Sequence, residues 1–241
     1  MLVVFISGSS GSRFKTIGIL GGMGPESTAE LYLRIIKLFQ KKFGAKYDDD
    51  YPEMIIYNLP IPDVVEDPTR MQDIRDMLVE DAKKLEALGV DIIGVACNTV
   101  DFFMPVMREA VSIPILSIID EIREKVKRKE KVGILATEMA IKEGLFDSLG
   151  PELILPTEAQ RKLLTRIIMN ILSGRRYSDD ASQINTMVKS MQDDGADLVV
   201  LGCTDLPLIY RRRKGVIDTI DILAEALVRE SSRPGSKRGG D

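Results

Sequence analysis

Short apolar runs alternate along the chain with longer amphipathic stretches. The apolar runs at residues 16–20, 53–59 and 91–97 are predicted to form strands. The stretches between them, 26–42 and about 70–88, have the apolar period of helices. Continuous apolar strands joined by helices are typical of a parallel sheet covered on both faces. The pattern therefore predicts an α/β fold with mainly parallel sheets.

The second half of the chain repeats phrases of the first half in the same order. The matching phrases are "KTIGIL" (15–20) with "EKVGIL" (130–135), "LEALGVDIIGVACNT" (85–99) with "MQDDGADLVVLGCTD" (191–205), and "IPILSIID" (113–120) with "KGVIDTID" (214–221). Any α/β protein can repeat a helix, glycine and strand phrase, but here a cysteine occupies the same place in two copies. We therefore predict two pseudo-symmetric, duplicated α/β domains with the active site in the cleft between them.

The domain boundaries follow from the repeat and from the composition of the two ends. The first domain is expected at residues 15–114 plus about 217–230, and the second at 115–216. Residues 1–14 and 231–241 are rich in glycine, serine and polar residues, so we expect a flexible N-terminal extension and a flexible C-terminal tail.

Composition narrows the class of partner. The 241 residues carry a net charge of −4, which gives no basic footprint for nucleic acid or for an anionic membrane. The apolar run at the start is too short for a signal-peptide core or for a membrane span of about 20 residues. We expect a cytoplasmic protein that binds a small molecule, with no nucleic-acid or membrane partner.

The chain contains two cysteines and no histidine. Ser/His/Asp and Cys/His catalytic arrangements both need imidazole as the base, so neither is available. Two cysteines without histidine also argue against a zinc site and against a disulfide framework. Proton transfer near neutral pH must therefore use Asp, Glu, Lys, Tyr or Cys.

Both cysteines end predicted strands and precede residues with polar side chains. Cys97 is followed by Asn98 and Thr99, and Cys203 is followed by Thr204. The backbone amides that open the next helix stabilise negative charge, so they can lower the thiol pKa from about 8.5 and hold a substrate carboxylate. The hydroxyl and amide side chains add further donors, which suits a small anionic substrate.

Two thiols on opposite faces of one carbon atom can interconvert stereoisomers. A thiolate removes the α-proton from one side, and a neutral thiol delivers a proton from the other side. Two alternatives remain open at this point: the cysteines are inert core residues, or they form a redox disulfide.

Three motifs together resemble one family. "GILGGMGPESTAELY", "ACNT" and "LGCTD" are similar to the cofactor-independent aspartate/glutamate racemase superfamily, particularly its aspartate racemase branch, over about residues 15–230. The resemblance implies that Cys97 and Cys203 are the two proton donors and acceptors. It also implies two pseudo-symmetric α/β domains, a homodimer, and activity without a metal or pyridoxal cofactor.

The glycine-rich motif lacks the third glycine of a dinucleotide fingerprint, so phosphate binding is only weakly indicated. Its glycines let the backbone approach a ligand, and Pro25 suits the first position of a helix. In the resembling family this loop contributes to the substrate site, which implies substrate contacts for Met23, Gly22 and Gly24.

The resemblance also bears on the substrate. Lys162 matches a substrate-binding lysine of the family, although a lysine early in a helix is more commonly a solvated surface residue. Val64 stands where aspartate racemases can carry an arginine, and Arg70 lies nearby in sequence. After "CNT" the chain has "VDFF" where the aspartate enzymes often have Ala-His. These departures weaken the aspartate assignment more than the racemase assignment.

The sequence thus predicts an isomerase that interconverts L- and D-aspartate by a two-base mechanism. A glutamate or broad acidic-amino-acid racemase and a two-cysteine isomerase of an unsaturated diacid are the alternatives within the superfamily. From another class, a small-anion binding module with structural cysteines is the alternative.

Overall fold

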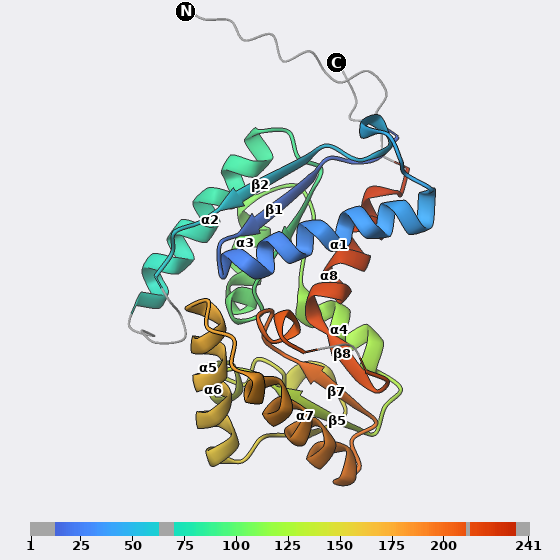
Figure 1. Cartoon of the computed structure of the whole chain (residues 1–241). Helices are drawn as coiled ribbons and strands as arrows, with labels where there is room; N and C mark the ends of the chain where they lie inside the picture. The colour runs from blue at the N-terminus through green and yellow to red at the C-terminus, as the bar shows by residue number, and fades with distance from the viewer. Residues whose placement is uncertain (1–12, 63–69, 211–212, 235–241) are drawn as a thin grey trace, which may run out of the picture.

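The computed structural model of the chain describes residues 13–62, 70–210 and 213–234. Val64, the residue found in place of the expected arginine, lies outside the described residues. The two parts of the chain that repeat each other form two α/β units, one above the other in Figure 1.

Each unit is built on a parallel sheet of four strands. The first sheet contains β1 (Ile17–Gly21), β2 (Met54–Asn58), β3 (Ile92–Val95) and β4 (Ile115–Leu116) in the order β2-β1-β3-β4. The second contains β5 (Lys131–Leu135), β6 (Glu152–Ile154), β7 (Leu198–Leu201) and β8 (Val216–Asp218) in the order β6-β5-β7-β8. Each strand of the second sheet holds the place of its counterpart in the first, and all the pairings are parallel. The predicted fold class, two duplicated α/β domains with parallel sheets, is confirmed.

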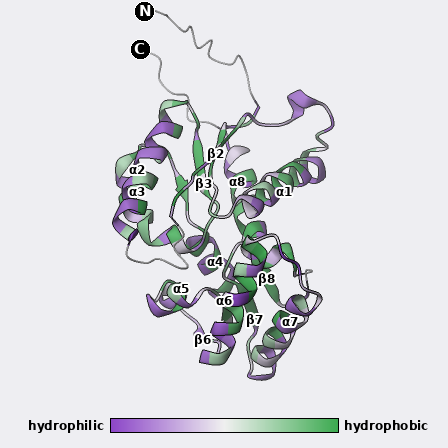
Figure 2. Cartoon of the chain, turned by 60° about the vertical axis from the view of Figure 1, so that its left-hand side comes forward, coloured by the Kyte–Doolittle hydropathy of each residue, from purple (hydrophilic) through white to green (hydrophobic). Residues whose placement is uncertain are grey.

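Helices connect the strands and cover the sheets. They are α1 (Pro25–Phe43), α2 (Met71–Ala87), α3 (Met104–Ala110), α4 (Ile118–Val126), α5 (Glu138–Lys142), α6 (Glu158–Leu172), α7 (Ser178–Asp193) and α8 (Thr219–Ser231). Short 3-10 turns occur at η1 (Asp48–Asp50), η3 (Thr99–Phe103), η4 (Asp147–Leu149) and η5 (Leu206–Leu208). The helices alternate hydrophobic and hydrophilic faces in Figure 2, as expected for helices that cover a sheet on one side and meet water on the other.

A continuous apolar core joins the two units. It includes Ile19 of the first sheet, Leu223 of α8 and Ile134 of the second sheet, each with no more than 1% of its surface exposed. Two further clusters fill the opposite faces, one under α2 and α3 and one under α6 and α7. The burial of this shared core fixes the two sheets relative to each other.

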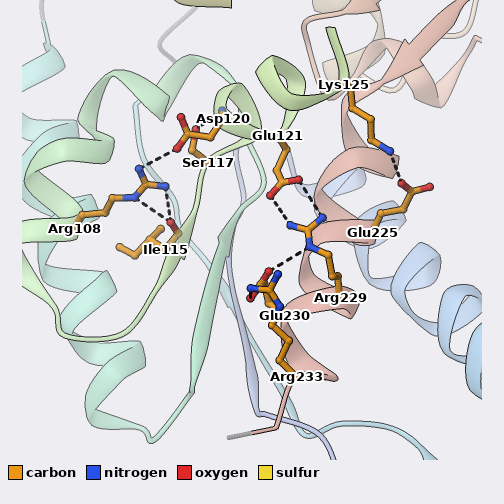
Figure 3. Close-up of polar contacts among 10 residues, drawn as sticks. All are labelled: Arg108, Ile115, Ser117, Asp120, Glu121, Lys125, Glu225, Arg229, Glu230 and Arg233. Carbon is orange, nitrogen blue, oxygen red and sulfur yellow. Dashed lines mark hydrogen bonds and ion pairs between the residues drawn. The ribbon is translucent and has the colours of Figure 1, made fainter. Parts of the chain in front are cut away.

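Helix α8 leaves the second sheet and packs back on the first unit beside α1 and α4 (Figure 1). Gly94 of β3 makes room for it, since a Cβ atom there would lie 2.7 Å from Leu227 Cδ1. Arg229 of α8 donates to Glu121 of α4 at 2.6 and 3.2 Å, and Lys125 pairs with Glu225 at 3.1 Å (Figure 3).

The strand pairings show which sheet contains the residues near the expected domain boundaries. β4 begins at Ile115 and pairs with β3, so the first two residues assigned to the second domain belong to the first sheet. β8 ends at Asp218 in the second sheet, so the return to the first domain begins with α8.

Phe14, which lies within the predicted N-terminal extension, belongs to the fold. The Phe14 ring is 8% exposed and meets the Phe39 ring edge to face, with the ring centres 4.8 Å apart. The Lys15 amide donates to the Ser231 carbonyl at 2.9 Å, which ties this segment to the end of α8. Within the described ranges, the helices are too short or too polar to cross a bilayer.

Candidate active site

A cavity of about 230 Å³ lies where the carboxyl ends of the two sheets meet. The residues that line it follow the strands β1, β2, β3, β5 and β7 or belong to α1 and α6. They are Gly22, Met23, Gly24, Pro25, Ile61, Pro62, Cys97, Asn98, Thr99, Thr137, Leu172, Cys203, Thr204 and Asp205. The structure thus brings together every predicted site residue except Lys162.

The two cysteines line this cavity from opposite sheets. Cys97 follows β3 and is 7% exposed, and Cys203 follows β7 and is 8% exposed. Both are free thiols. Their charges act on each other, since a Cys97 thiolate helps to raise the pKa of Cys203. The repeat in the sequence therefore corresponds to two thiols that share one site.

Burial governs the ionisation of Cys97. Loss of solvent raises its pKa from 9.0 to about 11, although the backbone amides of Val100 and Thr99 favour the thiolate. The nearby Asp205 carboxylate raises the pKa further. The expected lowering of the thiol pKa is therefore wrong for the site without substrate, because desolvation outweighs the amides.

Cys203 also holds its proton, and a carboxylate contacts it. Burial raises its pKa well above the ordinary value of a thiol, and the Asp205 carboxylate adds to the effect. The Cys203 thiol donates to Asp205 Oδ2 at a distance of 3.7 Å between sulfur and oxygen. A carboxylate that accepts this proton stabilises the neutral thiol.

Asn98 presents an unsatisfied acceptor at the cavity. The Thr219 hydroxyl donates to the Leu201 carbonyl at 3.0 Å, so its oxygen is left to accept from Asn98 Nδ2 at 3.4 Å. This orients the amide and leaves Asn98 Oδ1 without a hydrogen-bond partner among the described residues, on a side chain that is 2% exposed. A donor from a ligand, such as an ammonium group, would satisfy this buried oxygen.

The glycine-rich loop is held in place by a threonine of α1. Thr28 Oγ1 accepts from the Gly22 amide and donates to the Gly24 carbonyl, both at 2.9 Å. Gly22 has a φ of +94°, and a Cβ atom there would lie 2.5 Å from the Leu59 carbonyl oxygen. A Cβ on Gly24 would lie 3.3 Å from Asp205 Oδ1, so the loop reaches across to the second unit.

The second unit contributes Thr137 at the position that Gly22 holds in the first. Its hydroxyl accepts from the Ala140 amide at 3.3 Å and caps α5. Sequence reasoning missed this residue, although the repeat of "GIL" before both positions could have found it.

Other lining residues outside the prediction are Pro25, Ile61, Pro62, Leu172 and Asp205. Asp205 directly follows the "GCT" motif, and Pro25 lies in the glycine-rich motif. The remaining three are ordinary apolar residues in the sequence, and only tertiary packing brings them to the cavity.

Lys162 and Arg70, the two cations considered for a substrate carboxylate, lie outside the lining of the cavity. The Lys162 side chain is 70% exposed and pairs with Glu158 on the same helix at 2.7 Å. Leu172, the residue of that helix that lines the cavity, stands ten residues further on, about 15 Å along the axis. Arg70 pairs with Asp73 at 3.1 Å and is half exposed. The structure does not bring the predicted lysine contact to the cavity.

No cluster of three or more His, Cys, Asp or Glu side chains suited to a metal ion occurs in the part of the chain that the structure describes.

Comparisons with known proteins agree with this geometry. Residues 20–227 match the family model of Asp/Glu/hydantoin racemases. The broad specificity amino-acid racemase RacX of Bacillus subtilis is 31% identical over 210 residues, covering 85% of this chain and 92% of that protein.

Solved structures show the same fold. An aspartate racemase homologue from Pyrococcus horikoshii superposes with a TM-score of 0.75 at 30% identity, covering 91% of this chain and all of that one. The aspartate racemase of Picrophilus torridus superposes with a TM-score of 0.72 at 21% identity, covering 92% and 96% of the two chains. The duplicated fold, the paired cysteines and the family match together show that the chain belongs to the Asp/Glu/hydantoin racemase family and is an amino-acid racemase, an isomerase.

Proposed function

We propose that Cys97 and Cys203 are the two bases that invert the α-carbon of a free amino acid. The observation that carries this proposal is the pair of free, buried thiols that line one cavity from equivalent strand ends. The cavity of about 230 Å³ is smaller than the roughly 300–1,000 Å³ of pockets for drug-sized ligands, which suits a single amino acid.

The polar groups at the cavity suit the α-centre of such a substrate. Asn98 lines the cavity, and its Oδ1, which has no partner among the described residues, can accept from the α-ammonium group. The hydroxyls of Thr99 and Thr204 line the same cavity and can donate to the α-carboxylate. A bound ammonium group would also favour a thiolate nearby, which offsets part of the cost of ionising a buried cysteine.

The proton balance is symmetric. One thiolate takes the α-proton, the electron pair of that C–H bond passes into the carboxylate as an enolate, and the thiol on the other face returns a proton to the carbon. The two cysteines thereby exchange protonation states. The reverse reaction then begins from the other cysteine, and no redox partner is needed.

Aspartate is the substrate that the sequence motifs favour, with glutamate and a broader range as alternatives. The named relatives include an aspartate racemase homologue and a broad specificity racemase, so they support aspartate and a broader range in part. Activity on aspartate is therefore part of the test.

The test incubates the protein with single L-amino acids, measures the D-enantiomer by chiral chromatography, and follows α-proton exchange in deuterated water. Cys97→Ser and Cys203→Ser should each lower racemisation by about 10³-fold or more, because a serine hydroxyl is a far weaker base than a thiolate. One variant should still exchange the α-proton of the L-enantiomer and the other that of the D-enantiomer.

Circular dichroism and thermal melting would show that both serine variants remain folded. If either variant racemised at close to the parent rate, the two-base assignment would be wrong. A small-anion binding module would show no exchange with any substrate, in the parent or in the variants.

A further inference from the structure

The wall of the cavity that remains for the substrate side chain is apolar. Met23, Ile61, Pro62 and Leu172 line it beside the polar groups assigned to the α-centre. Among the described lining residues there is no lysine or arginine, and the one charged side chain is the carboxylate of Asp205. Building on the racemase function proposed above, we propose that this site selects amino acids with uncharged, apolar side chains and disfavours acidic ones.

A second carboxylate would be poorly compensated in this cavity. In this assignment the α-carboxylate and the α-ammonium group use Asn98, Thr99 and Thr204. Among the described lining residues, the hydroxyl of Thr137 is then the one uncharged polar side chain left for a second carboxylate, and a single neutral donor compensates a buried charge poorly. The side-chain carboxylate of aspartate would then lose water against Met, Ile, Pro and Leu side chains, and a buried charge without a partner is strongly unfavourable. The Asp205 carboxylate would repel it as well.

An apolar side chain gains from the same surroundings. Ile61 and Met23 pack against the apolar cluster that includes Cys97, so this wall is continuous with the core of the first unit. Leu172 closes the opposite side from the end of α6, where a Cβ atom on Gly24 would lie 3.1 Å from its Cδ2. Removing apolar substrate surface from water at such a wall favours binding.

One arginine that follows α6, Arg176, already has partners. Arg176 follows α6, donates to the Ile171 carbonyl at 2.8 Å, and pairs with Glu26 of α1. The sequence after Pro62, "DVVEDPT" at residues 63–69, contains three acidic residues and no lysine or arginine. Both facts argue against a cation that is free to bind an acidic side chain.

The single charge at the wall does not make the site one for basic amino acids. Asp205 Oδ2 accepts the proton of Cys203, and the side chain is 5% exposed. A lysine or arginine side chain would compete with the thiol for this carboxylate and would alter the ionisation of a reacting group. An uncharged side chain avoids both effects.

The experiment measures kcat/KM for L-leucine, L-methionine, L-aspartate, L-glutamate and L-lysine, with α-proton exchange in deuterated water recorded for each. We expect kcat/KM for leucine and methionine to exceed that for aspartate and glutamate by at least about tenfold, since a site without the required polar partner discriminates strongly against a buried charge.

A variant and its matched control test the wall directly. Leu172→Arg places a cation at the edge of the cavity, on a side chain that is 38% exposed and can accept the change. It should raise the ratio of aspartate to leucine turnover by about tenfold or more. Leu155→Arg makes the same substitution at a side chain that is 42% exposed and lies outside the cavity lining, so the ratio should stay unchanged.

The outcomes separate this proposal from the function on which it rests. Turnover of aspartate, glutamate or lysine at or above the rate for leucine would overturn the side-chain selectivity while leaving the racemase function intact. An unchanged ratio in Leu172→Arg would also overturn it. Absence of α-proton exchange with every amino acid would overturn both proposals.

Discussion

The two halves of the molecule place a cysteine at the same point of the same topology and give it different neighbours. Cys97 and Cys203 both follow the third strand of a four-stranded sheet and are almost equally buried. Two residues further along, the first half has Thr99 and the second half has Asp205. The fold is duplicated, but the electrostatic surroundings of the two thiols are not.

This difference indicates how the resting site divides the two roles. The backbone amides of Val100 and Thr99 favour the Cys97 thiolate, and the Asp205 amide favours that of Cys203, but only the Cys203 thiol donates to a carboxylate. We therefore expect Cys97 to ionise first and act as the base, with Cys203 as the acid. In the opposite direction of the reaction the roles are reversed.

The largest expected loss of stability comes from removing an ion pair that links the two halves. Arg34 of α1 is 12% exposed and pairs with Asp218, which is 8% exposed, and with Asp221 at 2.8 Å. Arg34→Met leaves a buried carboxylate without its guanidinium, so the free energy of unfolding should fall by about 3–5 kcal/mol in urea titrations.

The control for this change is Arg75→Met, which removes an exposed pair with Asp76 and should cost at most about 1 kcal/mol. If Arg34→Met cost no more than this control, the pair between α1 and the start of α8 would not hold the halves together.

The next largest effect is a loss of stability at high pH, which we expect because the buried thiols are neutral. Folding raises the pKa of Cys97 from 9.0 to about 11, so the folded state holds the proton more tightly than the unfolded state. This stabilisation is complete below pH 9 and is lost as the pH rises toward 11, at about 1.4 kcal/mol per pH unit, or roughly 2–3 kcal/mol in all.

Urea titrations of the parent and of Cys97→Ser across this range would measure the effect. The serine variant should lose less stability on going from pH 9 to pH 11, because serine does not ionise there. Cys203→Ser should change the slope in the same direction, because burial also raises the pKa of Cys203. An identical slope for parent and variants would contradict the burial of neutral thiols.

A smaller difference in stability is expected between the two loops that follow β1 and β5 and line the cavity. Gly22→Ala forces a side chain into a positive φ and against the Leu59 backbone, so it should destabilise the protein by about 2–3 kcal/mol and reduce turnover. Thr137→Ala, at the corresponding position, removes only the cap of α5 and should cost about 1 kcal/mol. Thermal melting of both variants measures the difference, and equal losses would mean that the two loops are interchangeable.

The last substitution should change stability least, and it tests most directly whether the two cysteines differ in their electrostatic surroundings. Asp205→Asn removes a charge that raises the pKa of both thiols, and the shift to lower pKa should be greater for Cys203, which contacts it. The pH dependence of iodoacetamide modification, followed for each cysteine by mass spectrometry, measures these shifts.

Asp101→Asn is the matched control for this substitution. Burial raises the pKa of Asp101 to about 6, so its carboxylate is charged above neutral pH. This negative charge raises the pKa of Cys97. Its removal should therefore lower the pKa of Cys97 and leave Cys203 nearly unchanged. A greater response of Cys97 than of Cys203 to Asp205→Asn would contradict the assignment of roles.

The sequence by itself determined the repeated strands, the helices between them and the meeting of Cys97 and Cys203. Apolar runs and helical periodicity are local properties of the chain, and a repeat carries its topology with it because equal patterns fold into equal units. Asn98, Thr99 and Thr204 follow from the same pattern, since they adjoin the ends of these strands, whereas the substrate contacts of the glycine-rich loop follow from the family resemblance of its motif.

Only the tertiary structure decided the ionisation of the thiols, the position of Lys162 and the apolar wall of the cavity. The pKa of a cysteine depends on how much water the folded chain removes, and no local pattern contains that quantity. The position of Lys162 depends on the direction of α6, which turns Leu172 instead of the lysine toward the cavity. Ile61, Pro62 and Leu172 look like ordinary apolar residues in the sequence, and they become part of the site only because the packing of the two units brings them to it.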